Sequence, residues 1–148
     1  MKRLSLCFLG GVLAVGLLLA PSSSEAATNI RLGLGADYWF EKTGTFQVTL
    51  GVDTHLAGPL TIGGRFGAML VASPNTLGIP IDLVLHANLA RQFYIEGLAG
   101  PWILFAGDTF RAHAAFGFGL QSGAISFGVE VGYLSPNPTV GLRFGYRF

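Results

Sequence analysis

The last nine residues of the chain, 140–148, alternate strictly between two kinds of side chain. Every second residue is apolar or aromatic, ending with Tyr146 and Phe148, while the residues between them are only glycine and arginine. Side chains along a β-strand point alternately to its two faces. The segment therefore predicts a strand with one apolar face and one face that combines arginine with almost no bulk. A strand that turns its apolar face to lipid and its other face to a narrow barrel lumen has this pattern.

The N-terminus has the pattern of a secretory signal peptide. Two basic residues precede an apolar run over residues 4–20, and a cleavage position follows Ala26. We expect residues 1–26 to be removed and residues 27–148 to form the mature protein. An uncleaved membrane anchor is the alternative, although the run is short for a spanning helix. The single cysteine, Cys7, lies in the removed segment, so the mature chain is expected to have no disulfide and no thiol chemistry.

The composition of the mature chain narrows the class of protein. Of the 148 residues, the 122 that follow the predicted signal fit one domain and contain seven basic and seven acidic residues. This balance does not imply nucleic acid as a partner. The whole sequence is 51% hydrophobic and 11% charged, yet no later run is long enough for a membrane-spanning helix. Export, high hydrophobicity and the lack of a spanning run together favour a membrane β-barrel.

The same alternation recurs along the whole mature chain and predicts eight strands of about ten residues, the length that a tilted membrane strand needs. The expected strands cover residues 30–40, 46–55, 60–70, 81–89, 93–99, 110–120, 125–133 and 139–148. The longer expected connections cover residues 41–45, 72–80, 101–109 and 135–138. They alternate with tight turns, which are expected on the periplasmic side. Every proline except Pro101 lies clear of these strands, as expected for a residue that sheets tolerate poorly, and Pro101 lies at the boundary between the fifth strand and the connection after it. The predicted fold is all-β: an eight-stranded, antiparallel, up-and-down transmembrane β-barrel.

With these features the mature chain resembles the small outer-membrane barrels of the OmpA/OmpX type. The terminal Phe148, preceded by Tyr146, is similar to the assembly signal that the barrel-assembly machinery reads in such proteins. The family's usual glycine six residues from the end is replaced by Arg143. The resemblance implies the outer membrane of a Gram-negative bacterium as the location. It also implies outer-membrane lipid, lipopolysaccharide and, during biogenesis, the assembly machinery as partners.

The glycine-rich face of the strands is expected to point into the lumen. A soluble, lipocalin-like barrel would place the apolar face inside, and its outer face would be rich in Lys, Glu, Ser and Thr rather than in glycine, which weakens a strand. An eight-stranded barrel is just wide enough for side chains to fill it. Charges buried in such a lumen need partners, and the sequence places five arginines and five acidic residues there. The predicted lumen charge network comprises Arg31, Asp37, Asp53, Arg65, Asp82, His86, Glu96, Arg111, Glu130, Arg143 and Arg147.

Two ion pairs follow from the expected hairpins. If residue 134 lies opposite residue 139, Glu130 lies directly across from Arg143. If the turn covers residues 90–92, His86 lies across from Glu96. A lumen filled with paired charges conducts poorly, so the pattern argues against an open porin, and these charges are expected to be structural.

Candidate chemistry in the predicted lumen is limited. No cofactor is implied, and the three histidines face inward near opposite ends of the barrel, so they cannot share one metal. Ser126, His86 and Glu96 supply the groups of a hydrolase, and Pro101 could interrupt strand pairing and open a side gap for a lipid substrate. The set points into the lumen, however, away from the lipid that such an enzyme would modify.

The sequence therefore predicts an integral outer-membrane barrel with a structural or partner-binding role and no catalysis. The alternatives are a lipid-modifying enzyme, a narrow channel for small solutes and a soluble lipocalin-like binder. The apolar stretch Trp102–Phe105 fits an extension of the fifth strand, with residues 103 and 105 facing lipid, better than it fits a docking patch for another membrane protein.

Overall fold

The computed structural model describes residues 28–40, 43–73, 75–107 and 109–148. The expected signal peptide, residues 1–26, lies outside these ranges. Among the described residues, no helix has the length and apolar character needed to span a membrane. The strands are β1 (Thr28–Trp39), β2 (Thr43–Ala57), β3 (Leu60–Val71), β4 (Thr76–Asn88), β5 (Phe93–Leu104), β6 (Phe110–Ser122), β7 (Ile125–Leu134) and β8 (Asn137–Arg147).

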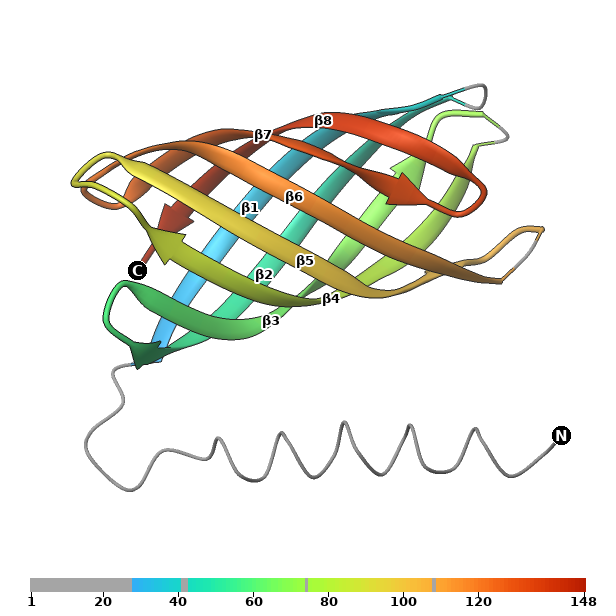
Figure 1. The fold of residues 1–148 in the computed structure, drawn as a ribbon. Coiled ribbons are helices and arrows are strands. Elements are labelled where there is room, and N and C mark those ends of the chain that lie inside the picture. The colour runs from blue at the N-terminus through green and yellow to red at the C-terminus, as the bar shows by residue number, and fades with distance from the viewer. Residues whose placement is uncertain (1–27, 41–42, 74, 108) are drawn as a thin grey trace, which may run out of the picture.

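The eight strands form one closed sheet. Each strand pairs in antiparallel fashion with the next along the chain, and β8 pairs with β1 to complete the circle (Figure 1). Closure leaves no strand edge without a neighbour. The structure confirms the predicted eight-stranded antiparallel barrel.

The two ends of the barrel differ in what they carry. β1 starts and β8 ends at one end, which we call the terminal end (Figure 1). The turns at residues 58–59, 89–92 and 123–124 lie there too, and Gly58 and Gly123 adopt the positive φ angles that tight hairpins require. The connections after β1, β3, β5 and β7 lie at the opposite end, which we call the distal end.

The alternation in the sequence becomes an inside and an outside of the wall. Side chains on the apolar face point outward, and many large ones are at least 40% exposed, for example Leu34, Leu83 and Phe127. Those on the other face point into the lumen, where most polar and charged groups are shielded. Such a wall has an apolar outer surface and a polar interior, which is the reverse of a soluble barrel.

Two strands extend into segments that had been assigned to long connections. Residues 76–80 were expected in a loop but open β4, whereas the favoured extension of the fifth strand beyond residue 101 is confirmed as far as Leu104. The expectation that strands exclude proline is wrong at Pro80 and Pro138, and Pro101 also lies within a strand. Proline fits at Pro80 and Pro101 because regular pairing with a neighbouring strand is interrupted beside each of them.

The β7–β8 hairpin also differs from the prediction. Leu134 lies opposite Asn137, not residue 139, because the turn contains only residues 135–136. Glu130 therefore lies across from Gly141, and the predicted direct pairing of Glu130 with Arg143 is wrong. The predicted pairing of His86 with Glu96 is confirmed.

Candidate functional site: the barrel lumen

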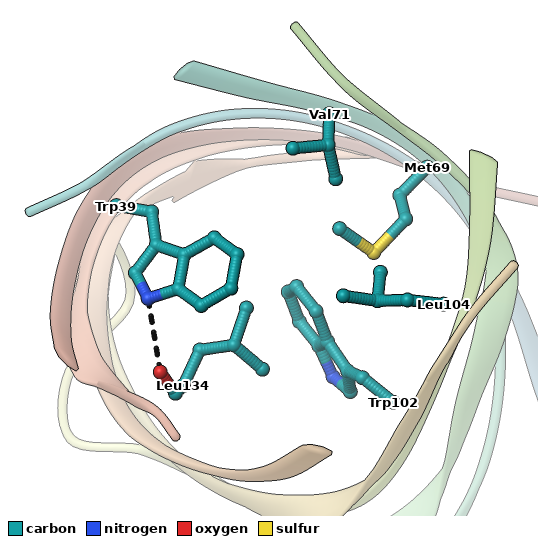
Figure 2. Packing of buried hydrophobic residues seen from close by; sticks show 6 residues of the cluster. All are labelled: Trp39, Met69, Val71, Trp102, Leu104 and Leu134. Atoms are coloured by element: carbon teal, nitrogen blue, oxygen red, sulfur yellow. Dashed lines mark hydrogen bonds between the residues drawn. The ribbon is translucent and has the colours of Figure 1, made fainter. Parts of the chain in front are cut away.

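An apolar cluster fills the distal end of the lumen. Its buried members, which we call the distal plug, are Trp39, Met69, Val71, Trp102, Leu104 and Leu134. Figure 2 shows them pointing inward from the surrounding strands. The last residue of every odd-numbered strand belongs to the plug, so its members converge at the same height.

The polar atoms of the two plug tryptophans are satisfied. Trp39 Nε1 donates to the carbonyl oxygen of Leu134 at 2.9 Å (Figure 2). Trp102 Nε1 donates to Asp82 Oδ1 at 3.1 Å. The guanidinium of Arg111 lies 5.3 Å from the centre of the Trp39 ring and donates to the carbonyl oxygen of Ser135 at 2.8 Å. The plug is thus anchored to the wall as well as packed.

A chain of alternating charges crosses the middle of the lumen below the plug. Arg65, on β3, lies 2.7 Å from Asp82 on β4 and 2.9 Å from Glu130 on β7. Glu130 also accepts from Arg143 on β8 at 2.6 Å. Arg143 in turn lies 2.6 Å from Asp37 on β1. The order is acid, base, acid, base, acid, so that each buried charge has an opposite neighbour, which the cost of burying ions requires. We call these five residues the ion chain.

His113 attaches to the ion chain from β6. Its Nδ1 lies 2.7 Å from Asp82 Oδ1, and its Nε2 lies 3.7 Å from Glu130 Oε1. An ionised carboxylate only accepts hydrogen bonds, so the Nδ1 nitrogen carries the hydrogen in the short contact. The imidazole also packs against the Trp102 ring, with centroids 4.3 Å apart. His113 therefore joins the ion chain to the distal plug.

A second charged group lies nearer the terminal end. Arg31 is 3.2 Å from Asp53 and 3.8 Å from Glu96. Glu96 lies 3.4 Å from His86 Nδ1, and His86 Nε2 lies 3.1 Å from Asn88 Oδ1. Both ring nitrogens of His86 are therefore engaged by side-chain oxygens.

A half-enclosed cavity of about 60 Å³ lies in this terminal half of the lumen. Thr61, Gly51 and Ser126 line it, as does Tyr94, whose ring stacks on His86 at a centroid distance of 4.9 Å. The buried hydroxyl of Thr61 has no hydrogen-bond partner among the described residues. This volume has room for a few water molecules. The lumen therefore changes from polar and partly open at the terminal end to apolar and filled at the distal end.

The predicted network residues do not all meet. The ion chain and the terminal group bring together most of them, but the pairing of Glu130 with Arg143 is diagonal rather than directly across the hairpin. Arg147 is exposed at the terminal end and donates to the carbonyl oxygen of Gly123 at 3.3 Å. Arg111 lies at the distal end, against the plug.

Three features of the lumen were not predicted. The distal plug was missed, although a large apolar residue on the polar face at the end of each odd strand is a signal for it. Trp102 and His113 were not identified as partners of Asp82. The contact of Trp102 with Asp82 runs diagonally between the neighbouring strands β5 and β4, and that of His113 reaches Asp82 from β6, two strands away. The alternation within one strand carries no information about either contact.

Ser126, His86 and Glu96, the candidate hydrolase residues, lie on the lumen face. Among the described residues, no group of three or more histidine, cysteine or acidic side chains could hold a metal ion. Ser126, His86 and Glu96 line the same cavity, as their shared face predicted. His86, however, turns its two nitrogens to Glu96 and Asn88 rather than to the serine.

Comparison with known proteins supports the fold. A scan of models of known protein families gave no match, and neither did a search of curated proteins. The structure is similar to a designed transmembrane β-barrel, with a TM-score of 0.63 and 14% identity over 86% of this chain and 100% of that chain. It is also similar to the outer-membrane protein Ail of Yersinia pestis in a phospholipid nanodisc, with a TM-score of 0.59 and 12% identity over 84% of this chain and 100% of that one. The chain thus has the fold of the small outer-membrane barrels.

Proposed function

We propose that this protein is an integral outer-membrane β-barrel of the OmpA/OmpX type with a closed lumen. Its role would be structural or partner-binding, without catalysis. The outward belt of large apolar side chains supports residence in a membrane, because a monomeric soluble protein rarely exposes a large apolar surface. The likeness to barrels that span bilayers supports the same location.

The closed lumen is the observation that carries the proposal. The distal plug and the ion chain lie in series, and the residues of both are largely buried. A channel for small solutes requires a continuous water-filled path, whereas here the cavity ends against packed side chains. The arrangement favours a protein that works through its outer surface.

Catalysis by Ser126 is disfavoured by the hydrogen bonding of His86. A general base must lie within hydrogen-bond reach of the proton that it removes. Both nitrogens of His86 are directed to other side chains, Glu96 and Asn88. A lipid-modifying enzyme would need a free nitrogen on the serine side.

The proposed partners contact different parts of the barrel. Outer-membrane lipid and lipopolysaccharide would contact the apolar wall. The assembly machinery would read Tyr146 and Phe148, whose rings meet edge to face at 5.2 Å on the outside of β8. A membrane-protein partner near Trp102–Phe105 would meet only Ile103 and Phe105, since residues 102 and 104 point into the plug.

Location is tested by separating the outer-membrane fraction and running the protein on SDS gels with and without boiling. We expect a membrane-fraction band whose mobility changes on heating, because a closed barrel resists detergent until it is heated. Recovery from the soluble periplasm without a heat shift would contradict the proposal and favour the lipocalin-like alternative.

Closure of the lumen is tested by recording current across planar bilayers that contain the purified barrel. We expect no resolved conductance steps from this protein, while a large-pore porin in the same bilayers serves as the positive control. Stable, ion-conducting steps that scale with the amount of inserted protein would support the channel alternative instead.

A further inference from the structure

The pairing of β4 with its neighbours is interrupted on both sides. On the β3 side, residues 79–80 face residues 67–68 without regular pairing, although the residues before and after them are paired. Pairing with β5 is absent where residues 81–82 face residues 100–101. The register is the same before and after each interruption, so no residue is inserted. Each residue from 79 to 82 thus lacks regular pairing with one neighbouring strand.

The sequence at this point explains the interruption. Pro80 and Pro101 have no N–H group to donate to a ladder. At Gly100 the backbone of β5 lies so close to β4 that an added Cβ would collide with the carbonyl oxygen of Ile81. The two strands therefore touch here without the regular backbone pairing that joins them on either side of this point.

Side chains hold the segment in place of the backbone. Asp82 accepts from Arg65 on β3 at 2.7 Å, from Trp102 on β5 at 3.1 Å and from His113 on β6 at 2.7 Å. It is 2% exposed and so has no competing contact with water. The carboxylate thus ties β4 to three other strands just where its ladder is broken.

The spaces on the two sides of this part of the wall lie close together. On the outside, an open apolar groove of about 600 Å³ is lined by Leu83, Ala99 and Ala114, beside the interruption. On the inside lies the terminal cavity. Leu98 lines both spaces.

We propose that residues 79–82 and 100–101 form a lateral gate in the barrel wall, which Asp82 holds closed from inside. Release of Asp82 parts β4 from β5 and joins the outer groove to the lumen. The lining of the groove suits one hydrocarbon chain of a membrane lipid, which would enter beside Leu98. The choice of a lipid chain rests on the proposed membrane residence.

Hydrogen exchange of the barrel in phospholipid vesicles tests the gate. In Asp82→Asn we expect exchange in peptides that cover residues 76–84 and 98–104 to rise about tenfold or more, because the charged hydrogen bonds are lost. Asp37→Asn is the matched control. It also removes a lumen carboxylate that binds an arginine, but its strand is paired continuously on both sides. Unchanged exchange in Asp82→Asn, or an equal rise in these peptides in Asp37→Asn, would overturn the gate.

A second variant opens the wall without removing a charge. Gly100→Ala introduces a Cβ against Ile81 and should push β5 away from β4. We expect the same two peptides to exchange faster in this variant. This variant tests the gate even if Asp82→Asn does not fold. Hydrogen exchange in these peptides as slow as in the unchanged protein would contradict the gate.

Fluorescence shows whether the opening faces lipid. The sequence has two tryptophans, so Trp39→Phe leaves Trp102 as the sole reporter beside the gate. In this background, quenching of Trp102 by lipids with brominated acyl chains is measured relative to the same variant in unbrominated lipid. The quenching should be stronger in Asp82→Asn than in Asp37→Asn. Faster exchange without added quenching would overturn the entry of a lipid chain. Failure to insert into vesicles would instead count against the proposed membrane function.

Discussion

Glu130 is the residue at which the charges of the lumen converge. It is 3% exposed and accepts hydrogen bonds from two arginines on different strands, Arg65 and Arg143. The bond to Arg65 crosses the lumen from β7 to β3, so it joins two walls that share no backbone pairing. One carboxylate therefore neutralises two buried guanidinium groups and braces the barrel across its width.

Removal of this charge should be costly. Glu130→Gln leaves Arg65 and Arg143 facing a neutral amide, and breaking a buried pair in this way costs about 3–5 kcal/mol. We expect that loss in the free energy of unfolding, measured by denaturant titration in micelles. Arg147→Gln is the control, because an exposed side chain away from such networks should change stability by no more than about 0.5 kcal/mol. Equal effects of the two substitutions would contradict a bracing role.

Substitution by alanine should change the stability of the barrel in opposite directions at two glycines on the lumen face. A Cβ at Gly67 would collide with the carbonyl oxygen of Val48, so Gly67→Ala should destabilise the barrel by about 1–3 kcal/mol. A Cβ at Gly51 would meet its nearest neighbours at 3.7 Å, an ordinary contact, so Gly51→Ala should stabilise by about 0.5–1 kcal/mol through lower unfolded-state freedom. Thermal unfolding of both variants measures these changes in stability. A Gly67→Ala variant more stable than Gly51→Ala would contradict the prediction.

At the scale of the strand, alternation predicts most of the barrel and fails where proline interrupts it. β1, β6 and β7 lie close to their predicted ranges because no proline occurs in them. The predicted starts of β4 and β8 were late because Pro80 and Pro138 were read as loop residues. The structure shows that a strand can pass through proline where pairing with a neighbour lapses, and sequence alone does not reveal where that happens.

The lumen was predictable as a set of inward residues but not as a set of partners. Parity along each strand places Asp82 and Arg65 inside without reference to any other strand. Contacts across the lumen, such as that of Arg65 with Glu130, depend on barrel size and strand tilt. The hairpin contact of Glu130 with Arg143 survived an error in register because an arginine is long enough to reach diagonally.

A substitution in the last residue of the chain should distinguish the efficiency of assembly from the stability of the folded barrel. Phe148 is 73% exposed, so Phe148→Ala should leave the folded barrel nearly as stable while lowering the amount assembled in the outer membrane severalfold. Phe110→Ala is the matched control, because this aromatic residue is 72% exposed but opens β6 instead. Quantitative blotting of outer-membrane fractions gives the comparison. Equal losses in both variants would argue that β8 carries no special signal.

At the scale of the whole molecule, the apolar belt determines which solvent the barrel needs. An outer wall of this kind is stable against hydrocarbon and would aggregate in water. The apolar belt surrounds the barrel, since every strand contributes exposed large apolar residues to it. The arrangement with apolar residues outside and polar residues inside thus holds all the way around the barrel.

The stability cost of an arginine on the outer wall should depend on how deep its position lies in the bilayer. Leu83 and Leu89 are 62% and 64% exposed, but Leu83 lies midway along β4 and Leu89 lies in the turn after it. Leu83→Arg should cost about 2–4 kcal/mol and Leu89→Arg about 0–1 kcal/mol in vesicles, because the cost rises toward the bilayer centre. Guanidinium titration of vesicle-embedded protein measures both. Similar small effects would indicate that the wall faces water.

The asymmetry of the lumen also has an electrical consequence. The terminal cavity is half-enclosed and lined in part by charged side chains, so its potential would follow that of the adjoining aqueous compartment. The distal plug consists of buried apolar and aromatic side chains, which polarise little. In the proposed membrane barrel, any voltage would therefore fall mainly over the plug, and Trp39 and Trp102 would experience a stronger field than the charges at the terminal end. In the proposed closed barrel, the distal plug is therefore the main dielectric layer.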